Sequence, residues 1–127
     1  MDPIASVREF IAAWNRRDRS ALAEALHPDA ICEGISLPPA AHGRAASLEL
    51  FDAFLAADEL DWQIVNIAAT DHAVFTERLD RFHYAGMNWT SVRACGYFEV
   101  DDQGLITVWR DYFDRVECLA AMPEQTN

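Results

Sequence analysis

The sequence is poor in basic residues, in cysteine and in long apolar runs. It has 10 Lys and Arg residues against 21 Asp and Glu residues, which gives a net charge of -11. A surface that binds nucleic acid or an anionic membrane needs a basic stripe to neutralise phosphates, and none is present. No apolar run is long enough to cross a membrane, and the first residues lack the basic and apolar segments of a signal peptide. We therefore expect neither a nucleic-acid partner nor a membrane.

The few cysteines and histidines argue against disulfide and metal chemistry. Cys32, Cys95 and Cys118 are too few and too scattered for a disulfide framework, and they form no CxxC pair. We interpret them as small packing residues in the reducing cytoplasm. The four histidines form no HxH or HxxxH pattern, so we expect no metal site and no cofactor.

Apolar residues are plentiful, and helical spacing dominates the first half of the chain. Of the 127 residues, 51% are hydrophobic, enough for the core of one domain over residues 1–127. A first helix is predicted after Asp2, with an apolar stripe of Ile4, Val7, Phe10, Ile11 and Trp14. A second short helix follows Asp18, carries Leu26 inward and stops before Pro28. A third is expected over residues 44–57.

Strand patterns dominate the second half. We expect strands over residues 62–69, 73–84, 89–100 and 105–115, with an earlier brief strand over 31–35, a proline-rich loop over 36–43 and a terminal helix over 116–122. Helices followed by a meander of strands predict an α+β fold, in which the helices pack on the concave face of a curved, mixed but mainly antiparallel sheet. The hollow between the two layers is a natural small-molecule pocket.

Three charged residues fall on otherwise apolar strand faces. Arg78 and Asp80 are two positions apart, so they share one face of their strand. On the last strand Asp111 shares a face with Trp109. Buried charges are costly unless they pair. We therefore expect Arg78, Asp80 and Asp111 to meet in one pocket and to perform acid–base chemistry there.

The chemistry of these residue types fits that expectation. Arginine is a fixed fork of donors that can hold two carboxylates. Two neighbouring carboxylates split their proton affinities, so that one donates a proton while the other acts as a base. Such a set can add water across a strained ring without a metal, a thiolate or a covalent intermediate. The same spacing is also typical of a surface ion pair and of a solvated or turn-capping aspartate, and spacing alone leaves these interpretations open.

Longer segments around these residues resemble a known family. Segments 76–80 (TERLD), 96–100 (GYFEV) and 106–114 (ITVWRDYFD) closely resemble the limonene-1,2-epoxide hydrolase family, and so do the LPPA and GR sequences at 37–40 and 43–44. The likeness extends from the first helix to the last strand. It implies a cone-shaped α+β fold of the nuclear-transport-factor-2-like (NTF2-like, SnoaL-like) type, usually homodimeric through the open face of the sheet.

The resemblance also implies a role for each charged residue. Asp80 would be the acid that protonates the epoxide oxygen, Asp111 the base that activates water, and Arg78 the bridge between them. The substrates would be water and a small or medium apolar epoxide, and the product a vicinal diol formed in one step without a cofactor.

One departure from the family concerns the attacking water. The family holds this water with a tyrosine and an asparagine, two residues apart, on the strand before the proline loop; this sequence has Cys32 and Gly34 there. A thiol is a weak hydrogen-bond partner and glycine has no side chain. Either another group holds the water, such as Asn66 or a main-chain carbonyl, or the site is wider and serves a bulkier epoxide.

Apolar residues flank the three charges, and two other functions stay open. At inward strand positions these residues are Phe82, Val92, Ala94 and Phe113, which we expect to contact substrate, to form simple core, or both. The loss of the water-holding pair would also suit another acid–base enzyme, such as an isomerase, a dehydratase or a polyketide-type cyclase. The third candidate is a non-catalytic module that holds an apolar ligand or recruits a protein.

Overall fold

In the computed structural model, which describes residues 2–124, helices come first and long strands follow. The elements are α1 (Pro3–Asn15), α2 (Arg19–Ala25), β1 (Leu26–Gly34), β2 (Ala41–His42), α3 (Arg44–Leu55), β3 (Glu59–Thr70), β4 (Ala73–His83), β5 (Thr90–Val100), β6 (Ile106–Phe113) and α4 (Arg115–Ala121). Within the described residues, no helix is long and apolar enough to cross a membrane.

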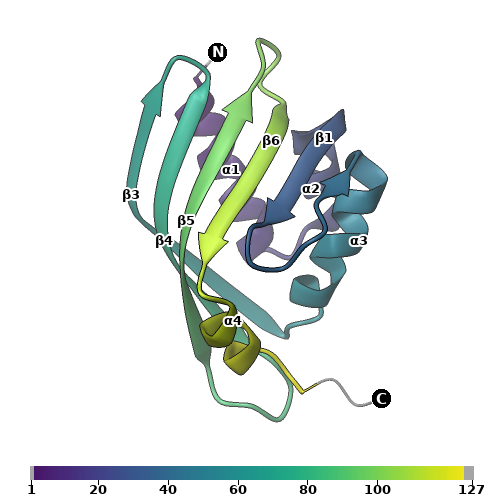
Figure 1. Ribbon diagram of the computed structural model, residues 1–127, viewed down its shortest axis with the longest axis vertical. Coiled ribbons are helices and arrows are strands. Elements are labelled where there is room, and N and C mark those ends of the chain that lie inside the picture. The colour runs from purple at the N-terminus through teal and green to yellow at the C-terminus, as the bar shows by residue number, and fades with distance from the viewer. Residues whose placement is uncertain (1, 125–127) are drawn as a thin grey trace.

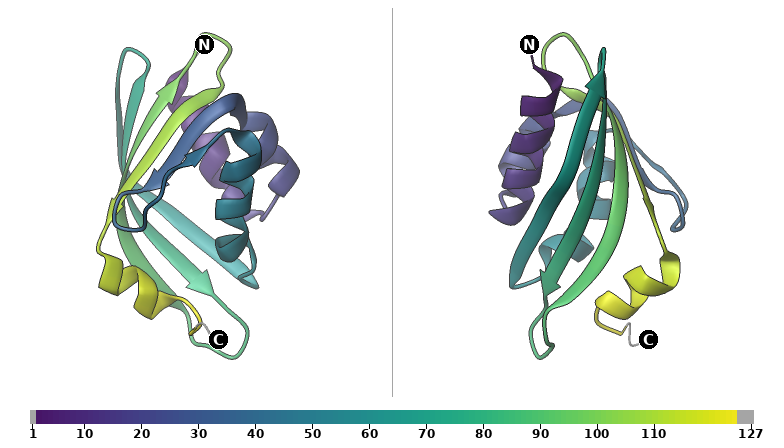
Figure 2. Two further views of the ribbon diagram at one scale, coloured as in Figure 1. Left: turned by 45° about the vertical axis from the view of Figure 1, so that its right-hand side comes forward. Right: turned by 90° about the vertical axis from the view of Figure 1, so that its left-hand side faces the viewer.

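The strands form one curved sheet in the order β2-β1-β6-β5-β4-β3. β1 runs parallel to β6, and all other neighbours are antiparallel. Figure 1 shows β3 to β6 as a meander of long strands, and Figure 2 shows α1, α2 and α3 together on the concave side of the sheet. The predicted α+β fold, with helices on the concave face of a mixed and mainly antiparallel sheet, is confirmed.

Local sequence signals set the helix starts. The Asp2 carboxylate accepts a hydrogen bond from the main-chain N–H of Ile4 at 3.0 Å, and Pro3 occupies the first helical position of α1. The Asp18 carboxylate accepts from the main-chain N–H of Ala21 at 3.1 Å and starts α2. Both caps agree with the sequence analysis.

Two features near Pro28 differ from the prediction. α2 ends at Ala25, so Leu26, which we expected on the helix, begins β1 and is fully buried. Proline has no N–H and disfavours helical backbone at the residue before it, so the chain becomes extended early. The segment predicted as a loop contains β2, which pairs with β1 at the edge of the sheet.

Burial alternates along β4, and this alternation shows which of its residues face the helices and which face outward. Val74, Thr76, Arg78, Asp80 and Phe82 are buried, while the residues between them are exposed or half-buried. The side chains of Arg78 and Asp80 are 0% and 6% exposed. The interpretation of this pair as a surface ion pair is therefore wrong.

Aromatic rings fill the space between the helices and the sheet. Trp14 of α1 stacks on Trp62 of β3, with ring centroids 4.4 Å apart, and meets Phe51 of α3 at 4.9 Å. Phe98 of β5 stacks on Trp109 of β6 at 5.6 Å. The apolar stripe predicted on the first helix thus forms the centre of the core.

The convex face of the sheet carries exposed apolar side chains. Val65, Phe75 and Tyr112 are 59%, 48% and 50% exposed. Cys95 is also exposed. Our interpretation of Cys95 as a packing residue is wrong, because its position on β5 is out of phase with the buried side chains of that strand.

Candidate active site

The strand register brings the three charged residues together. Gly96 of β5 pairs with Thr76 of β4 on one side and with Asp111 of β6 on the other. Asp111 therefore faces β4 across a single glycine. Arg78 lies one inward position further along β4, from which its long side chain reaches Asp111 across the glycine.

All five N–H groups of the Arg78 guanidinium have an acceptor. Nε and Nη2 donate to the two carboxylate oxygens of Asp80 at 3.0 and 2.9 Å. Nη1 and Nη2 donate to the two oxygens of Asp111 at 3.1 and 2.6 Å. Nη1 also donates to Thr76 Oγ1 at 3.0 Å. The guanidinium therefore holds both carboxylates at fixed positions.

Gly96 leaves the space through which this network runs. A Cβ atom added to Gly96 would lie 2.5 Å from Arg78 Nη1, 2.7 Å from Asp111 Oδ1 and 2.9 Å from Thr76 Oγ1. Contacts this short do not occur between real side chains, so any other residue here would push the polar groups apart. We infer that the network requires a glycine at this position.

Indole rings enclose the charged cluster. Trp109 Nε1 donates to Asp111 Oδ1 at 2.7 Å, the same oxygen that Arg78 Nη1 contacts. The rings of Trp62 and Trp109 have their centroids 5.6 and 6.0 Å from Arg78 Cζ, within the range of cation–π attraction. These rings help to keep water away from the guanidinium.

Burial and charge together set the protonation of the cluster. Burial raises the pKa of Asp80, the Arg78 charge lowers it, and the Asp111 charge raises it, with a net increase. Burial lowers the pKa of Arg78, but the charges of Asp111 and Asp80 outweigh that effect and raise it. One permanent cation thus faces two carboxyl groups, and one added proton makes the cluster neutral. Asp80 is the more buried of the two, with 6% side-chain exposure against 15% for Asp111.

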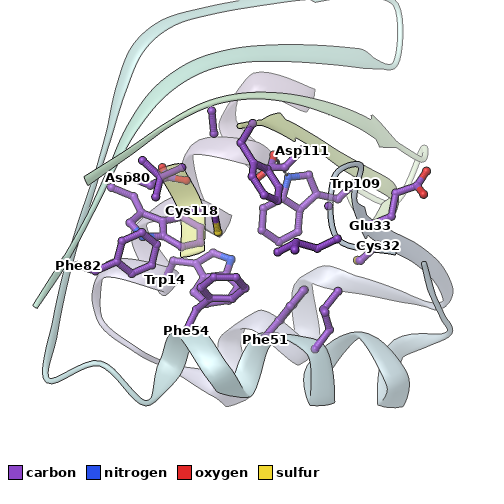
Figure 3. Close-up of a pocket in the computed structure, with 17 residues that line it drawn as sticks. Trp14, Cys32, Glu33, Phe51, Phe54, Asp80, Phe82, Trp109, Asp111 and Cys118 are labelled. Atoms are coloured by element: carbon purple, nitrogen blue, oxygen red, sulfur yellow. Dashed lines mark hydrogen bonds between the residues drawn. The ribbon is translucent and has the colours of Figure 1, made fainter. Parts of the chain in front are cut away.

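A pocket opens beside this cluster, between the sheet and the helices (Figure 3). Its volume is about 670 Å³, open mouth included, and Asp80 and Asp111 both line it. The rest of its wall is largely apolar and includes Trp14, Leu37, Leu50, Phe51, Phe54, Trp62 and Trp109. Within residues 2–124, no three His, Cys, Asp or Glu side chains are close enough together to hold a metal ion.

Six uncharged residues singled out in the sequence line this pocket. They are Cys32, Gly34, Phe82, Val92, Ala94 and Phe113. Phe82, Val92 and Ala94 are at the same time buried core residues, with 3%, 4% and 5% exposure. For these three, the core and the pocket wall are one and the same.

At positions 32 and 34, the strand before the proline loop offers the pocket no strong hydrogen-bonding side chain. Burial raises the pKa of Cys32 to about 11, a hydrogen bond with Ser47 lowers it, and the charge of Asp111 raises it. The thiol therefore stays neutral. A Cβ atom added to Gly34 would lie 2.9 Å from two ring carbons of Phe113. The ring of Phe113 thus occupies the space beside Gly34.

Cys118 of α4 is a pocket residue that sequence analysis did not connect with the site. It is buried, and burial raises its pKa, with further increases from the charges of Asp80 and Asp111. A neutral thiol is a poor nucleophile. The interpretation of Cys32 and Cys118 as small packing residues agrees with their burial.

Asn66, which we considered as a holder of the water, lies elsewhere. The pairing of β3 with β4 shifts register between Ile64 and Asn66, so that Asn66 pairs with Glu77. Its side-chain amide donates to the Glu77 carboxylate at 2.7 Å on the exposed side of the sheet. This expectation was wrong, because the bulge reverses the direction of the side chain.

Thr76 and Gly96 are the two members of the network that sequence reasoning missed. Thr76 shares the two-residue spacing of Arg78 and Asp80, and that spacing could have identified it. Gly96 has no such signal, because its importance comes from the atoms packed over it.

Comparisons with known proteins show the family of this chain. Residues 1–124 match the limonene-1,2-epoxide hydrolase catalytic domain. The chain belongs to this family of epoxide hydrolases. Epoxide hydrolase EphG of Mycobacterium tuberculosis is 33% identical to it over 109 residues, which cover 86% of this chain and 71% of that protein.

Solved structures place the family member among NTF2-like folds. A limonene-1,2-epoxide-hydrolase-like epoxide hydrolase of M. tuberculosis superposes with a TM-score of 0.80 at 30% identity, covering 94% of this chain and 88% of the other. An NTF2-like protein of unknown function from Burkholderia pseudomallei gives a TM-score of 0.82 at 18% identity, covering 98% of this chain and 100% of the other. The second likeness concerns the fold alone.

Proposed function

We propose that this epoxide hydrolase opens its substrate in one step with Asp80 as the acid and Asp111 as the base. Asp111 removes a proton from a water molecule, whose oxygen attacks one carbon of the epoxide. The bond between that carbon and the ring oxygen breaks, and the ring oxygen takes the proton of Asp80. The product is a vicinal diol. Proton exchange with solvent then restores a protonated Asp80 and an ionised Asp111.

The five hydrogen bonds of Arg78 carry this proposal. They hold two carboxyl groups beside one pocket, and the single arginine charge balances only one carboxylate. The raised pKa of Asp80 favours the protonated state that an acid needs. Asp111 accepts hydrogen bonds from Arg78 and Trp109, which hold its carboxylate at a fixed position beside the pocket.

The pocket wall supports a largely apolar substrate of small or medium size. Leu50, Phe51 and Phe54 of α3 face the sheet, and apolar atoms dominate the surface between the two layers.

Isotope labelling tests the proposed reaction. The protein would be incubated with a panel of cyclic and open-chain epoxides in water enriched in oxygen-18, and the products weighed by mass spectrometry. We expect diols that carry one heavy oxygen, and loss of the product in both Asp80→Asn and Asp111→Asn. A folded protein that opens none of the epoxides would rule out the proposal.

A second candidate is an acid–base cyclase that uses the same two carboxyl groups. Phe113 fills the space beside Gly34, so no side chain from that strand position can hold a water near Asp111. In this reaction Asp111 deprotonates a hydroxyl group of the substrate itself, which attacks the epoxide and forms a cyclic ether. The product then has the same mass as the substrate, whereas hydrolysis adds the mass of water. Epoxides that bear a hydroxyl group distinguish the two reactions.

We also propose that the chain forms a homodimer through the convex face of its sheet. Val65, Phe75 and Tyr112 leave apolar surface exposed on that face, and apolar patches of this kind are common at protein interfaces. Analytical ultracentrifugation should give twice the mass of the chain, and Phe75→Glu should give the mass of one chain. A monomer at micromolar concentration would refute this proposal.

A further inference from the structure

Two indole N–H groups in the pocket wall have no hydrogen-bond partner. Trp14 and Trp62 both line the pocket and are 0% and 5% exposed, and neither Nε1 atom has an acceptor among the described residues. Figure 3 shows the Trp14 ring with its nitrogen turned towards the middle of the pocket. The third indole of the wall, Trp109, does have an acceptor in Asp111. Trp14 and Trp62 are therefore the two unpaired donors of this wall.

The two unpaired indoles pack against each other. Their rings stack with an interplanar angle of 21°. The side-chain amide of Asn15 accepts from the main-chain N–H of Trp62 at 2.7 Å and donates to its carbonyl at 3.0 Å. Asn15 thus fixes the backbone of Trp62 while its neighbour Trp14 packs on the ring.

The indole pair lies next to the charged cluster and extends away from it. Trp62 pairs with Asp80 between β3 and β4, so their side chains are neighbours on the concave face. Trp14 lies further along the pocket, with its ring centroid 4.9 Å from that of Phe51 and 6.4 Å from that of Phe54. A ligand whose epoxide meets Asp80 therefore extends past Trp62 towards Trp14.

Buried donors without an acceptor are rare and costly, and a ligand that supplies the acceptor removes that cost. We propose that the substrate is an epoxide with a second polar group, a carbonyl oxygen, that accepts a hydrogen bond from Trp14 or Trp62. This inference rests on the proposed function, because it assumes that the epoxide meets Asp80. Both nitrogen atoms are covered by neighbouring side chains, so the carbonyl reaches them by packing in among the rings.

A carbonyl group fits these donors better than a hydroxyl group. An indole nitrogen donates one hydrogen bond and accepts none. A hydroxyl group would bring its own donor, which would need an acceptor in the same apolar region. Asp80 and Asp111 supply the carboxylate oxygens of the inner wall, and Arg78 already binds both. A carbonyl oxygen accepts only and adds no unpaired donor.

Matched epoxides test the inference. One is a cyclohexene oxide with an acetyl group, and the other carries an isopropyl group of nearly the same shape at the same ring carbon. We expect the native chain to open the acetyl compound with a kcat/KM about fivefold higher, the gain of one added hydrogen bond. Trp14→Phe or Trp62→Phe should abolish this preference, so that the variant opens the two compounds with equal kcat/KM. Trp89→Phe, which changes an indole outside the pocket, should keep the preference.

Binding without reaction separates this inference from the proposed function. Calorimetry would compare acetylcyclohexane with isopropylcyclohexane, neither of which has an epoxide to open. If no epoxide is opened but the acetyl compound binds more tightly, and only Trp14→Phe or Trp62→Phe removes the difference, the carbonyl site stands and the proposed reaction fails. Equal binding of acetylcyclohexane and isopropylcyclohexane to the native chain overturns the inference. So does a preference for acetylcyclohexane that survives in both variants.

Discussion

Phe113 and Gly34 share one space beside Asp111. The two residues come from neighbouring parallel strands, and a Cβ atom at position 34 would lie 2.9 Å from two carbons of the Phe113 ring. Gly34 itself pairs with Asp111 in the register of β1 and β6. The residue at position 34 and the ring at position 113 are therefore coupled. Both lie next to Asp111, which we propose as the base that activates water.

Restoring an amide at position 34 should succeed only when Phe113 is reduced. Gly34→Asn alone should lower the free energy of unfolding by about 1–3 kcal/mol, because the new side chain is forced against the ring. The double variant Gly34→Asn/Phe113→Ala should lose less free energy of unfolding than the two single variants lose together. Urea unfolding of the four chains measures this coupling. Strict additivity of the two changes would show that the residues do not compete for space.

Gly96→Ala should disrupt the hydrogen-bond network around Arg78. The added methyl group meets Arg78, Asp111 and Thr76 at distances that no packed structure tolerates, so we expect the rate of diol formation to fall about a hundredfold or more, as when a positioned group is displaced. Gly86→Ala is the matched control. Gly86 has a positive φ of 79° and open space around it, so this variant should lose some stability and keep its activity. Equal activity in both variants would contradict the role of Gly96.

Neutral isosteres of the two carboxyl groups should abolish turnover. Asp80→Asn removes the proposed acid and Asp111→Asn the proposed base, and each should lower kcat by about a hundredfold or more. Asp52→Asn, which changes an exposed carboxylate paired with Arg19, should leave kcat unchanged. Circular dichroism would confirm that all three variants fold. Full activity in either pocket variant would remove that residue from the mechanism.

The stability contribution of Asp80 should decrease as the pH rises. Burial raises its pKa in the folded chain, against the opposing effect of Arg78. The folded state thus favours the protonated form, whose contribution is complete below the unfolded pKa of about 3.9 and is lost as the pH passes the folded pKa. Relative to Asp80→Asn, the native chain should be most stable below about pH 4 and lose that advantage as the pH rises through the raised pKa of Asp80 in the folded chain. Urea unfolding of both chains at a series of pH values measures this difference in stability. A difference that grows as the pH rises would refute the prediction.

Arg78→Met should destabilise the fold far more than the loss of an exposed ion pair. It leaves two buried carboxyl groups without their cation, and breaking a buried pair costs about 3–5 kcal/mol. Arg19 makes a similar two-point contact with Asp52, but both side chains are 52% exposed. Arg19→Met should therefore change the unfolding midpoint very little, since water solvates the separated charges. Equal midpoints for the two variants would mean that the buried network adds no stability.

Two-residue alternation predicted the inner face of β4, and with it the burial of Arg78 and Asp80. This works because a regular strand has only two faces. The same rule failed for Asn66, because a register shift after Ile64 turns its side chain to the other face. A bulge of this kind depends on the neighbouring strand and leaves no clear mark on the sequence.

Contacts between distant segments were the other part that sequence could not supply. The approach of Asp111 to Arg78 depends on the register of three strands. The cost of burying charges and the family resemblance both predicted this approach, but neither could supply the register. Cys118 reaches the pocket because α4 packs beside β5. The fit of Phe113 against Gly34 depends on atomic distances, which neither periodicity nor residue type reveals.

The acceptors of the five Arg78 hydrogen bonds all belong to β4 and β6, and none belongs to a helix. The helices contribute to the pocket only Trp14, Leu50, Phe51, Phe54 and Cys118. The residues that we propose to transfer protons and much of the pocket wall thus lie in separate segments of the chain. Mutational libraries confined to α1 and α3 can therefore search for new substrates while the reaction itself is inherited unchanged, and natural divergence has the same freedom.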